Sequence, residues 1–223
     1  MAIRGICLTV VLCGLCSLHA QTGSPLVFTV TQPGPGRPYM LTIKNISANT
    51  VNAFVYTFPL RGAPASLNMT IQDFRDPLLE GESKPIPPNQ ELTVNLAGAS
   101  LADIQLRAVL FADGSIWGDP EWAQRISTRR KTMVQQLVPV LADLNSALAR
   151  GTSREDLVSQ FESSLKLETQ IAGRGDPGAD VINPRRVVLV NLRLNARNPV
   201  DVVVRSQIKH LTSQMEALQA ATQ

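Results

Sequence analysis

The chain of 223 residues contains only three cysteines, and all of them lie within its first sixteen positions: Cys7, Cys13 and Cys16. They fall in an uncharged apolar run, residues 5–18, which follows Arg4 and ends just before Ala20. A basic start, a short apolar stretch and a small residue at its end are typical of a secretory signal peptide. We therefore predict that residues 1–20 are a signal peptide cleaved after Ala20, and that the protein is secreted or periplasmic.

Removal of this segment would leave a mature chain without cysteine, which excludes disulfides, a thiol nucleophile and cysteine-ligated metal sites. Two alternatives remain open. The apolar run could be retained as an anchor, although it is shorter than the ~20 residues that a spanning helix needs. Cys13 or Cys16 could be lipidated, although each follows a leucine where a small residue is usual. No membrane span is expected after signal cleavage.

Charged and aromatic residues are also scarce, at 17% and 4% of the chain, and the net charge is only +3. These values disfavour a strongly basic nucleic-acid binder and a highly charged disordered tail. The shortage of aromatic side chains also argues against a sugar-binding cleft, because such clefts use aromatic faces as stacking platforms. Hydrophobic residues make up 44% of the chain, which is ample for a folded core.

Histidine occurs twice, and His210 is the only one outside the predicted signal peptide. A histidine-rich metal site is thereby excluded by number. A Ser-His-Asp triad would need His210, but no Gly-x-Ser-x-Gly nucleophile motif and no phosphate-binding glycine loop accompany it. We expect His210 to be a surface residue, and we predict no catalytic residue, no metal site and no cofactor.

Residues 24–118 consist of short alternating or β-branched runs separated by turn signals. We predict strands at residues 26–31, 39–44, 51–58, 67–71, 91–96, 104–112 and 115–117. Asp113-Gly114 predicts a tight hairpin turn between the last two. Because each strand has one apolar face to bury, we expect a two-layer antiparallel β-sandwich.

One part of this region resembles a known kind of module. Residues 41–55 form a strand, an Asn-Ile-Ser turn and a second strand, and residues 86–94 supply a later Pro-Pro turn followed by another strand. Together they resemble the immunoglobulin-like or fibronectin-like modules of secreted bacterial proteins that carry a helical C-terminal region. The resemblance implies a fold, and it carries no catalytic residue to this chain.

Residues 119–223 carry helical signals instead. Asp119-Pro120 is typical of a helix start, and the apolar residues that follow recur every three or four positions as far as Gly151. Pro139 lies inside this helix and is expected to kink it. Ser153 and Asp156 resemble a capping box for a second helix.

Two further start signals, Asn183-Pro184 and Asn198-Pro199, follow. The first opens residues 185–197, which fit a helix or a strand; we favour the helix. The second opens an amphipathic helix at residues 200–221. The whole chain is therefore predicted to be α+β: an N-terminal immunoglobulin-like β-sandwich at residues 24–118, followed by three or four helices at residues 119–223.

The apolar stripe of the last helix is our candidate for a surface that binds a partner or a second copy of the chain. It consists of five residues: Val204, Ile208, Leu211, Met215 and Leu218. Trp117 and Trp122 flank the predicted domain boundary, and we expect them to pack between the sandwich and the first helix.

Three acidic residues near that boundary, Asp113, Asp119 and Glu121, could supply oxygen ligands for calcium. Their spacing matches no calcium-binding loop, so we favour a turn residue, a helix cap and a helix residue. The densest basic runs are residues 129–131 and 185–186. Since no aromatic residues alternate with them in the sequence, we expect solvated helix faces.

Paired carboxylates are the remaining catalytic chemistry, with Glu80 and Glu82 or Glu155 and Asp156 as candidates by adjacency. Asn45 and Asn68 begin glycosylation sequons. The favoured function is a non-catalytic secreted or periplasmic interaction or scaffold protein, whose partner is another envelope or extracellular protein or a second copy. The alternatives are a carboxylate-using hydrolase and a glycan-binding module.

Overall fold

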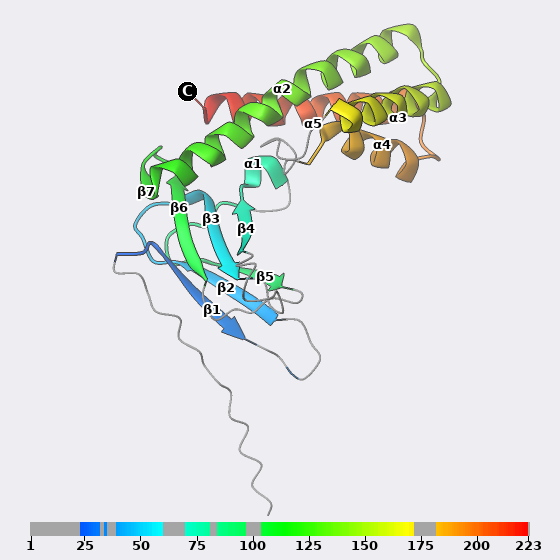
Figure 1. The fold of residues 1–223 in the computed structure, drawn as a ribbon. Helices are drawn as coiled ribbons and strands as arrows, with labels where there is room; N and C mark the ends of the chain where they lie inside the picture. Colours follow the sequence, from blue (N-terminus) through cyan, green and yellow to red (C-terminus); the bar gives the residue numbers. More distant parts are fainter. Residues whose placement is uncertain are drawn as a thin grey trace, which may run out of the picture.

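The computed structural model describes residues 23–31, 34, 39–59, 70–80, 84–96, 104–171 and 182–222. The predicted signal peptide, Glu82 and the Asn68 sequon lie outside the described residues. The described chain is α+β, as predicted, with the strands gathered below and the helices above and to one side (Figure 1).

The seven strands among the described residues form two antiparallel sheets. Sheet A has the order β1 (Leu26–Thr31), β2 (Tyr39–Asn45), β5 (Glu91–Leu96). Sheet B has the order β4 (Thr70–Arg75), β3 (Val51–Pro59), β6 (Gln105–Phe111), β7 (Ile116–Gly118). Most predicted strands overlap an observed one, but β4 extends to residue 75, whereas the prediction ended at residue 71.

The two sheets share one hydrophobic cluster. Leu41 and Ile43 of β2 are fully buried in it, together with Phe54 and Tyr56 of β3. The ring of Tyr56 lies 5.6 Å from that of Phe28 on β1, which joins the sheets directly. The apolar residues that alternate along the strands therefore point into this common core.

The central strand β3 is buried on both faces. Its even-numbered aromatic residues face sheet A, whereas Ala53 and Val55 pack on the other side against Ala123 and Ile126. Those two residues belong to the first long helix, which crosses the outer face of sheet B. A strand covered on both sides needs apolar residues at nearly every position, and β3 has them.

Four long helices follow the sheets: α2 (Pro120–Arg150), α3 (Arg154–Ile171), α4 (Pro184–Leu194) and α5 (Val200–Ala220). The start signals act as predicted at two of them. Asp119 accepts a hydrogen bond from the Glu121 amide at 2.8 Å, and Asn183 accepts one from the Arg185 amide at 2.9 Å. Residues 184–194 are therefore helical rather than extended. At α5 the N-cap is Pro199, with no side-chain capping bond.

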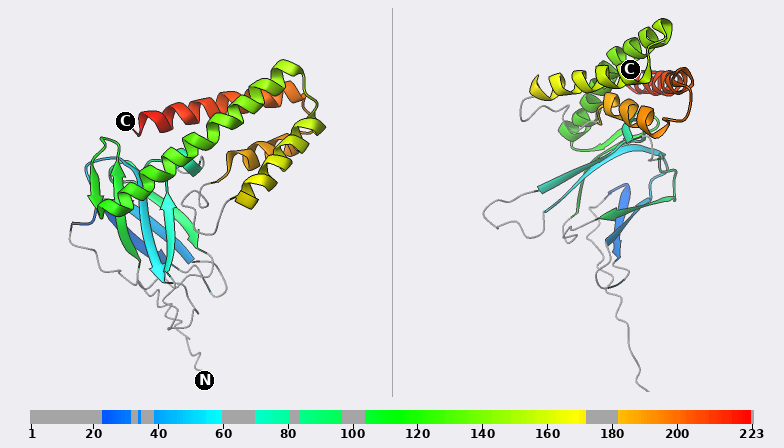
Figure 2. Two further views of the ribbon diagram at one scale, coloured as in Figure 1. Left: turned by 45° about the horizontal axis from the view of Figure 1, so that its top comes forward. Right: turned by 90° about the vertical axis from the view of Figure 1, so that its right-hand side faces the viewer.

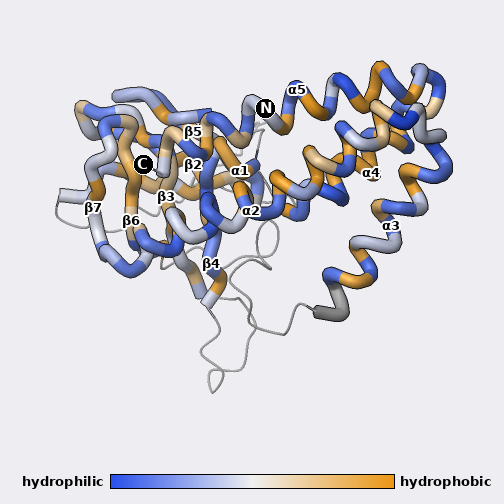
Figure 3. Tube along the Cα trace, turned by 90° about the horizontal axis from the view of Figure 1, so that it is seen from above, coloured by the Kyte–Doolittle hydropathy of each residue, from blue (hydrophilic) through white to orange (hydrophobic). Residues whose placement is uncertain are grey.

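The helices pack around a second core, to which all four contribute together with a short helix, α1 (Pro77–Glu80). Figures 1 and 2 show α5 beside α2, with the C-terminus returning toward the sheets. Each helix carries hydrophobic and hydrophilic residues along its length (Figure 3), as expected for helices with one buried face. No described helix is long and apolar enough to cross a bilayer.

The helix α1 is an element that the sequence analysis missed. It lies between β4 and the helical region, and Leu79 is buried in the helical core. Its start, Asp76-Pro77, is the same signal that was used at Asp119-Pro120. The Asp76 side chain accepts a hydrogen bond from the Leu78 amide at 3.1 Å, so the signal could have identified this helix.

Gly118 makes the tight connection from β7 to α2 possible. Its φ is +95°, and a Cβ there would overlap the Arg107 carbonyl oxygen, to which the Asp119 amide donates at 2.9 Å. We predict that Gly118→Ala lowers the free energy of unfolding by at least about 2 kcal/mol, from unfavourable φ plus a backbone clash.

Urea unfolding measures this loss, and Gly114→Ala is the matched control. Gly114 also has a positive φ, of +82°, but a Cβ there meets nothing within 4 Å. We expect the control to cost about 1 kcal/mol. Equal losses in both variants would show that the close approach to Arg107 does not matter.

Candidate functional site

The apolar stripe of α5 is used inside the chain. Val204, Leu211 and Leu218 are buried in the helical core, and Ile208 and Met215 pack against it. The stripe is the contact of α5 with its neighbouring helices, and so it is not a free surface for a partner. The predicted amphipathic helix is confirmed, but the period of the apolar residues alone does not show which molecule covers that face.

The two tryptophans lie on different sides of sheet B. Trp117 is partly buried against the core between the sheets. Trp122, in the first turn of α2, packs against sheet B, where its ring lies 6.2 Å from that of Phe74 on β4. Trp122 thus occupies the position expected for both, whereas Trp117 belongs to the sheets.

The three acidic residues near the boundary have local roles. Asp113 accepts hydrogen bonds from the Ser115 amide and hydroxyl, at 2.9 and 2.6 Å, and these bonds lower the pKa of its carboxyl. Asp119 caps α2. Within the described residues, no group of three or more His, Cys, Asp or Glu side chains could hold a metal ion.

The sequence analysis expected both basic runs to be solvated helix faces, and this is wrong for one arginine in each run. Arg130 is only 2% exposed, and Arg185 is 8% exposed. Arg185 donates to Asp143 at 2.5 Å and to Glu168 at 2.8 Å, which ties α4 to α2 and α3. The sequence places these acids far from the arginines, so only the fold reveals the pairs.

The most buried ion pair among the described residues joins the sheets to the helices. Arg130 of α2 donates from Nε to Asp76 Oδ2 at 2.7 Å and from a terminal nitrogen to Asp76 Oδ1 at 3.2 Å. The side chains are 2% and 3% exposed. Since Asp76 also caps α1, this bidentate pair fixes the end of β4, the start of α1 and the middle of α2 relative to one another.

We predict that Arg130→Met and Asp76→Asn each lower the free energy of unfolding by about 3–5 kcal/mol, because each leaves a buried charge without its partner. Asn retains the oxygen that caps α1, so that variant tests the charge. The double variant should cost less than the sum of the single variants, by at least about 1 kcal/mol.

Urea unfolding of all three variants gives these energies. Lys44→Met is the control, because Lys44 forms an exposed pair with Glu91 at 3.7 Å and should lose under about 1 kcal/mol. A loss at Arg130 as small as that at Lys44 would contradict a structural role for the buried pair.

A second polar group lies beside this junction. The buried Tyr56 hydroxyl donates to Asp73 Oδ2 at 2.5 Å, and Arg75 donates to the same oxygen at 2.8 Å. Glu80 lies 3.9 Å from Arg75. Burial, and after it the negative charge of Asp73, raises the pKa of the Tyr56 phenol above its ordinary value.

We predict that Tyr56 stays protonated in the folded protein well above pH ~10, the ordinary value for tyrosine. Because the folded pKa is the higher one, its contribution to stability is complete below that pH and is lost as pH rises toward the folded pKa. In Tyr39→Phe, whose only tyrosine is Tyr56, phenolate absorbance should appear only with unfolding. Phenolate formation near pH 10 in the folded variant would disprove this.

A surface patch on the outer side of sheet B combines arginine and aromatic side chains. The Arg125 guanidinium lies 4.4 Å from the Trp122 ring, and that of Arg107 lies 5.9 Å from the same ring. The Arg129 guanidinium lies 4.3 Å from the Phe74 ring. We call these five residues the Arg–aromatic surface.

The sequence analysis missed this surface because Phe74 comes from another element and Trp122 from an earlier turn of the same helix. No aromatic residue alternates with the basic run at residues 129–131, but β4 supplies Phe74 and the previous turns of α2 supply Trp122. The side chains of Phe74, Trp122, Arg107 and Arg129 are partly exposed. Arg and Trp are among the residue types enriched at binding hot spots.

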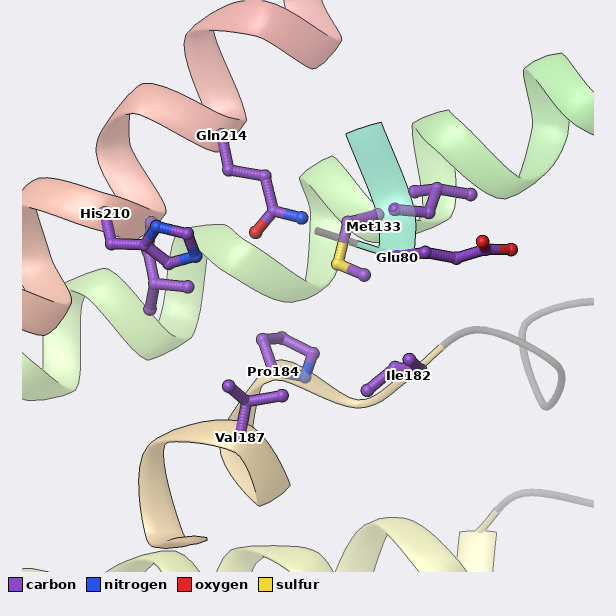
Figure 4. A pocket seen from close by; sticks show the side chains of 9 residues that line it. Glu80, Met133, Ile182, Pro184, Val187, His210 and Gln214 are labelled. Atoms are coloured by element: carbon purple, nitrogen blue, oxygen red, sulfur yellow. The ribbon is translucent and has the colours of Figure 1, made fainter. Parts of the chain in front are cut away.

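A small open pocket lies between α1, α2, α5 and the start of α4 (Figure 4). Its walls are mostly apolar, as at Met133, Pro184 and Val187. His210, which is exposed on α5 as predicted, lies on the opposite side of the pocket from Glu80 in Figure 4. These two titratable side chains therefore form no acid–base pair.

The remaining predicted candidates are also in structural positions. Asp156 accepts from Ser153 in the predicted capping box, and Glu155 is exposed. Asn45 is fully buried, and its amide donates to the carbonyls of Asn49 and Ile86 at 2.8 Å each. In the folded chain, Asn45 is thus a turn-stabilising residue that is closed to glycosylation.

No family model matches this chain, and no curated protein or solved structure matches it significantly.

Proposed function

We propose that this chain is a non-catalytic interaction protein, secreted or periplasmic, in which an immunoglobulin-like β-sandwich carries a helical region. The observation that carries the proposal is the Arg–aromatic surface. It is the place among the described residues where the fold gathers several residues of the types that dominate binding interfaces.

The strand order supports the sandwich. Sheet A contains the first, second and fifth strands, and sheet B contains the third, sixth and seventh. An immunoglobulin constant domain divides these six strands in the same way. The difference is β4, which pairs with β3 instead of joining the first sheet. The core shared by both sheets also supports two packed layers.

The positions of the acidic residues support a non-catalytic role. Asp73, Asp76, Asp143 and Glu168 are paired with arginines. A hydrolase would need two carboxylates that face a substrate cleft. The four carboxylates named here form ion pairs with arginines instead. The glycan-binding alternative is also weakened, because guanidinium groups already lie over the rings of Trp122 and Phe74.

Export can be tested in the organism that encodes the chain, with a C-terminal tag and mass spectrometry. We expect the protein in the periplasm or the medium, with Gln21 as its first residue. An uncleaved chain that begins at Met1 and remains in the cytoplasm would contradict the proposal.

Interaction can be tested in the same cells by photo-crosslinking. A photoreactive residue is placed at one exposed position at a time: Gln124, Ala142 or Lys209. Gln124 is next to Arg125 in the sequence, whereas Ala142 lies farther along α2 and Lys209 lies on α5. We expect at least one position to give a discrete adduct with one exported protein, identified by mass spectrometry. If all three positions give no adduct in growing cells, the chain is not the interaction protein proposed here.

A further inference from the structure

We propose that the Arg–aromatic surface binds an acidic segment of a partner protein, with the partner's carboxylates held by Arg107 and Arg125. The inference rests on the proposed interaction function and names the chemistry of the partner. The surface spans β4, β6 and α2, so the fold assembles it from three separate parts of the chain.

The rings orient the cationic groups. A guanidinium that stacks on an aromatic face keeps its in-plane N–H donors, and these match a carboxylate in a bidentate fork. Arg107 is fixed further, because its Nε donates to the Thr57 hydroxyl at 3.0 Å. Among the described residues, no carboxylate forms an ion pair with Arg107, so its terminal nitrogens can donate to one from a partner.

One carboxylate of the chain already occupies part of this surface. Glu121 lies 3.1 Å from Arg125, and its side chain is 73% exposed. An exposed pair of this kind contributes little to stability, so a partner's carboxylate can replace Glu121 at small cost. Glu121 thus shows the chemistry that the surface recognises.

The amount of charge favours an acidic protein segment over a polyanion. Arg125 already pairs with Glu121, and the whole chain carries only +3. Nucleic-acid binding depends on many phosphate contacts, and anionic membranes attract clusters of about 4–8 basic residues. A short surface of stacked arginines around a tryptophan matches a protein–protein hot spot instead.

The test is fluorescence anisotropy with a labelled oligo-glutamate peptide and the purified exported protein. We compare Arg107→Gln/Arg125→Gln/Arg129→Gln with a control, Arg150→Gln/Arg186→Gln/Arg205→Gln, which removes the same charge from exposed positions elsewhere. The first triple variant should bind at least about tenfold more weakly than the wild type, as expected for the loss of a charged hydrogen bond. The control should stay within about twofold, the part due to net charge alone.

Two single variants sharpen the test. Glu121→Gln should bind the peptide more tightly, because it frees Arg125 from its intramolecular carboxylate. Arg125→Gln should bind more weakly; its side chain is 44% exposed, so it tests the proposal even if the triple variant does not fold. Circular dichroism and urea unfolding check the fold of every variant.

Several results would overturn the inference. These are no binding by the wild type, equal losses in the two triple variants, or tighter binding to phosphatidylglycerol vesicles or duplex DNA than to oligo-glutamate. Crosslinks from Ala142 or Lys209 with none from Gln124 would also overturn it, while leaving the interaction function in place. Absence of crosslinks at all three positions would instead remove the proposed function itself.

Discussion

The buried pair between Asp76 and Arg130 is the interaction on which the rest of the structure depends. A carboxylate and a guanidinium that are almost fully buried must pair with each other, because either alone would be costly to remove from water. The two residues are 54 positions apart in the chain. Asp76 caps the start of α1, and Arg130 lies within α2. Their contact holds α2 against the end of β4 and directs α1 into the helical core. The buried charge pair therefore joins the sheets to the helices together with the apolar contacts of Ala123 and Ile126 on sheet B.

The position of the Arg–aromatic surface follows from the way this pair orients α2. Arg129 and Arg130 are neighbours in the chain, but on a helix their side chains point in different directions. Once Arg130 is turned inward to Asp76, Arg129 lies over Phe74, and Arg125, one turn earlier, lies over Trp122. The interior pair and the Arg–aromatic surface are thus two consequences of one helix orientation. A partner bound at this surface would contact β4, β6 and α2 together, at the point where the sheets meet the helices.

Local signals in the sequence predicted the elements well. Alternation located most strands, and Asp119-Pro120 and Asn183-Pro184 located helix starts, because capping depends on neighbouring residues. The helix α1 shows the same signal at Asp76-Pro77 and was overlooked. The candidate site could not be predicted in this way. The partners of Arg130 and Arg185 lie far away in the sequence, and Phe74 meets Arg129 only after β4 and α2 have packed. The α5 stripe had the right period but the wrong partner, since α2 covers it within the chain.

Because α2 is tied to sheet B by the buried pair and by apolar contacts, we expect the sheets and helices to unfold as one cooperative unit. Urea unfolding followed with two probes on the same sample tests this most directly. Tryptophan fluorescence reports on sheet B and its junction with α2, where Trp117 and Trp122 lie, and far-ultraviolet circular dichroism reports mainly on the helices. The structure predicts that the two transitions coincide in midpoint and slope. A helical signal that is lost at a clearly different urea concentration from the fluorescence change would show that the two parts fold independently.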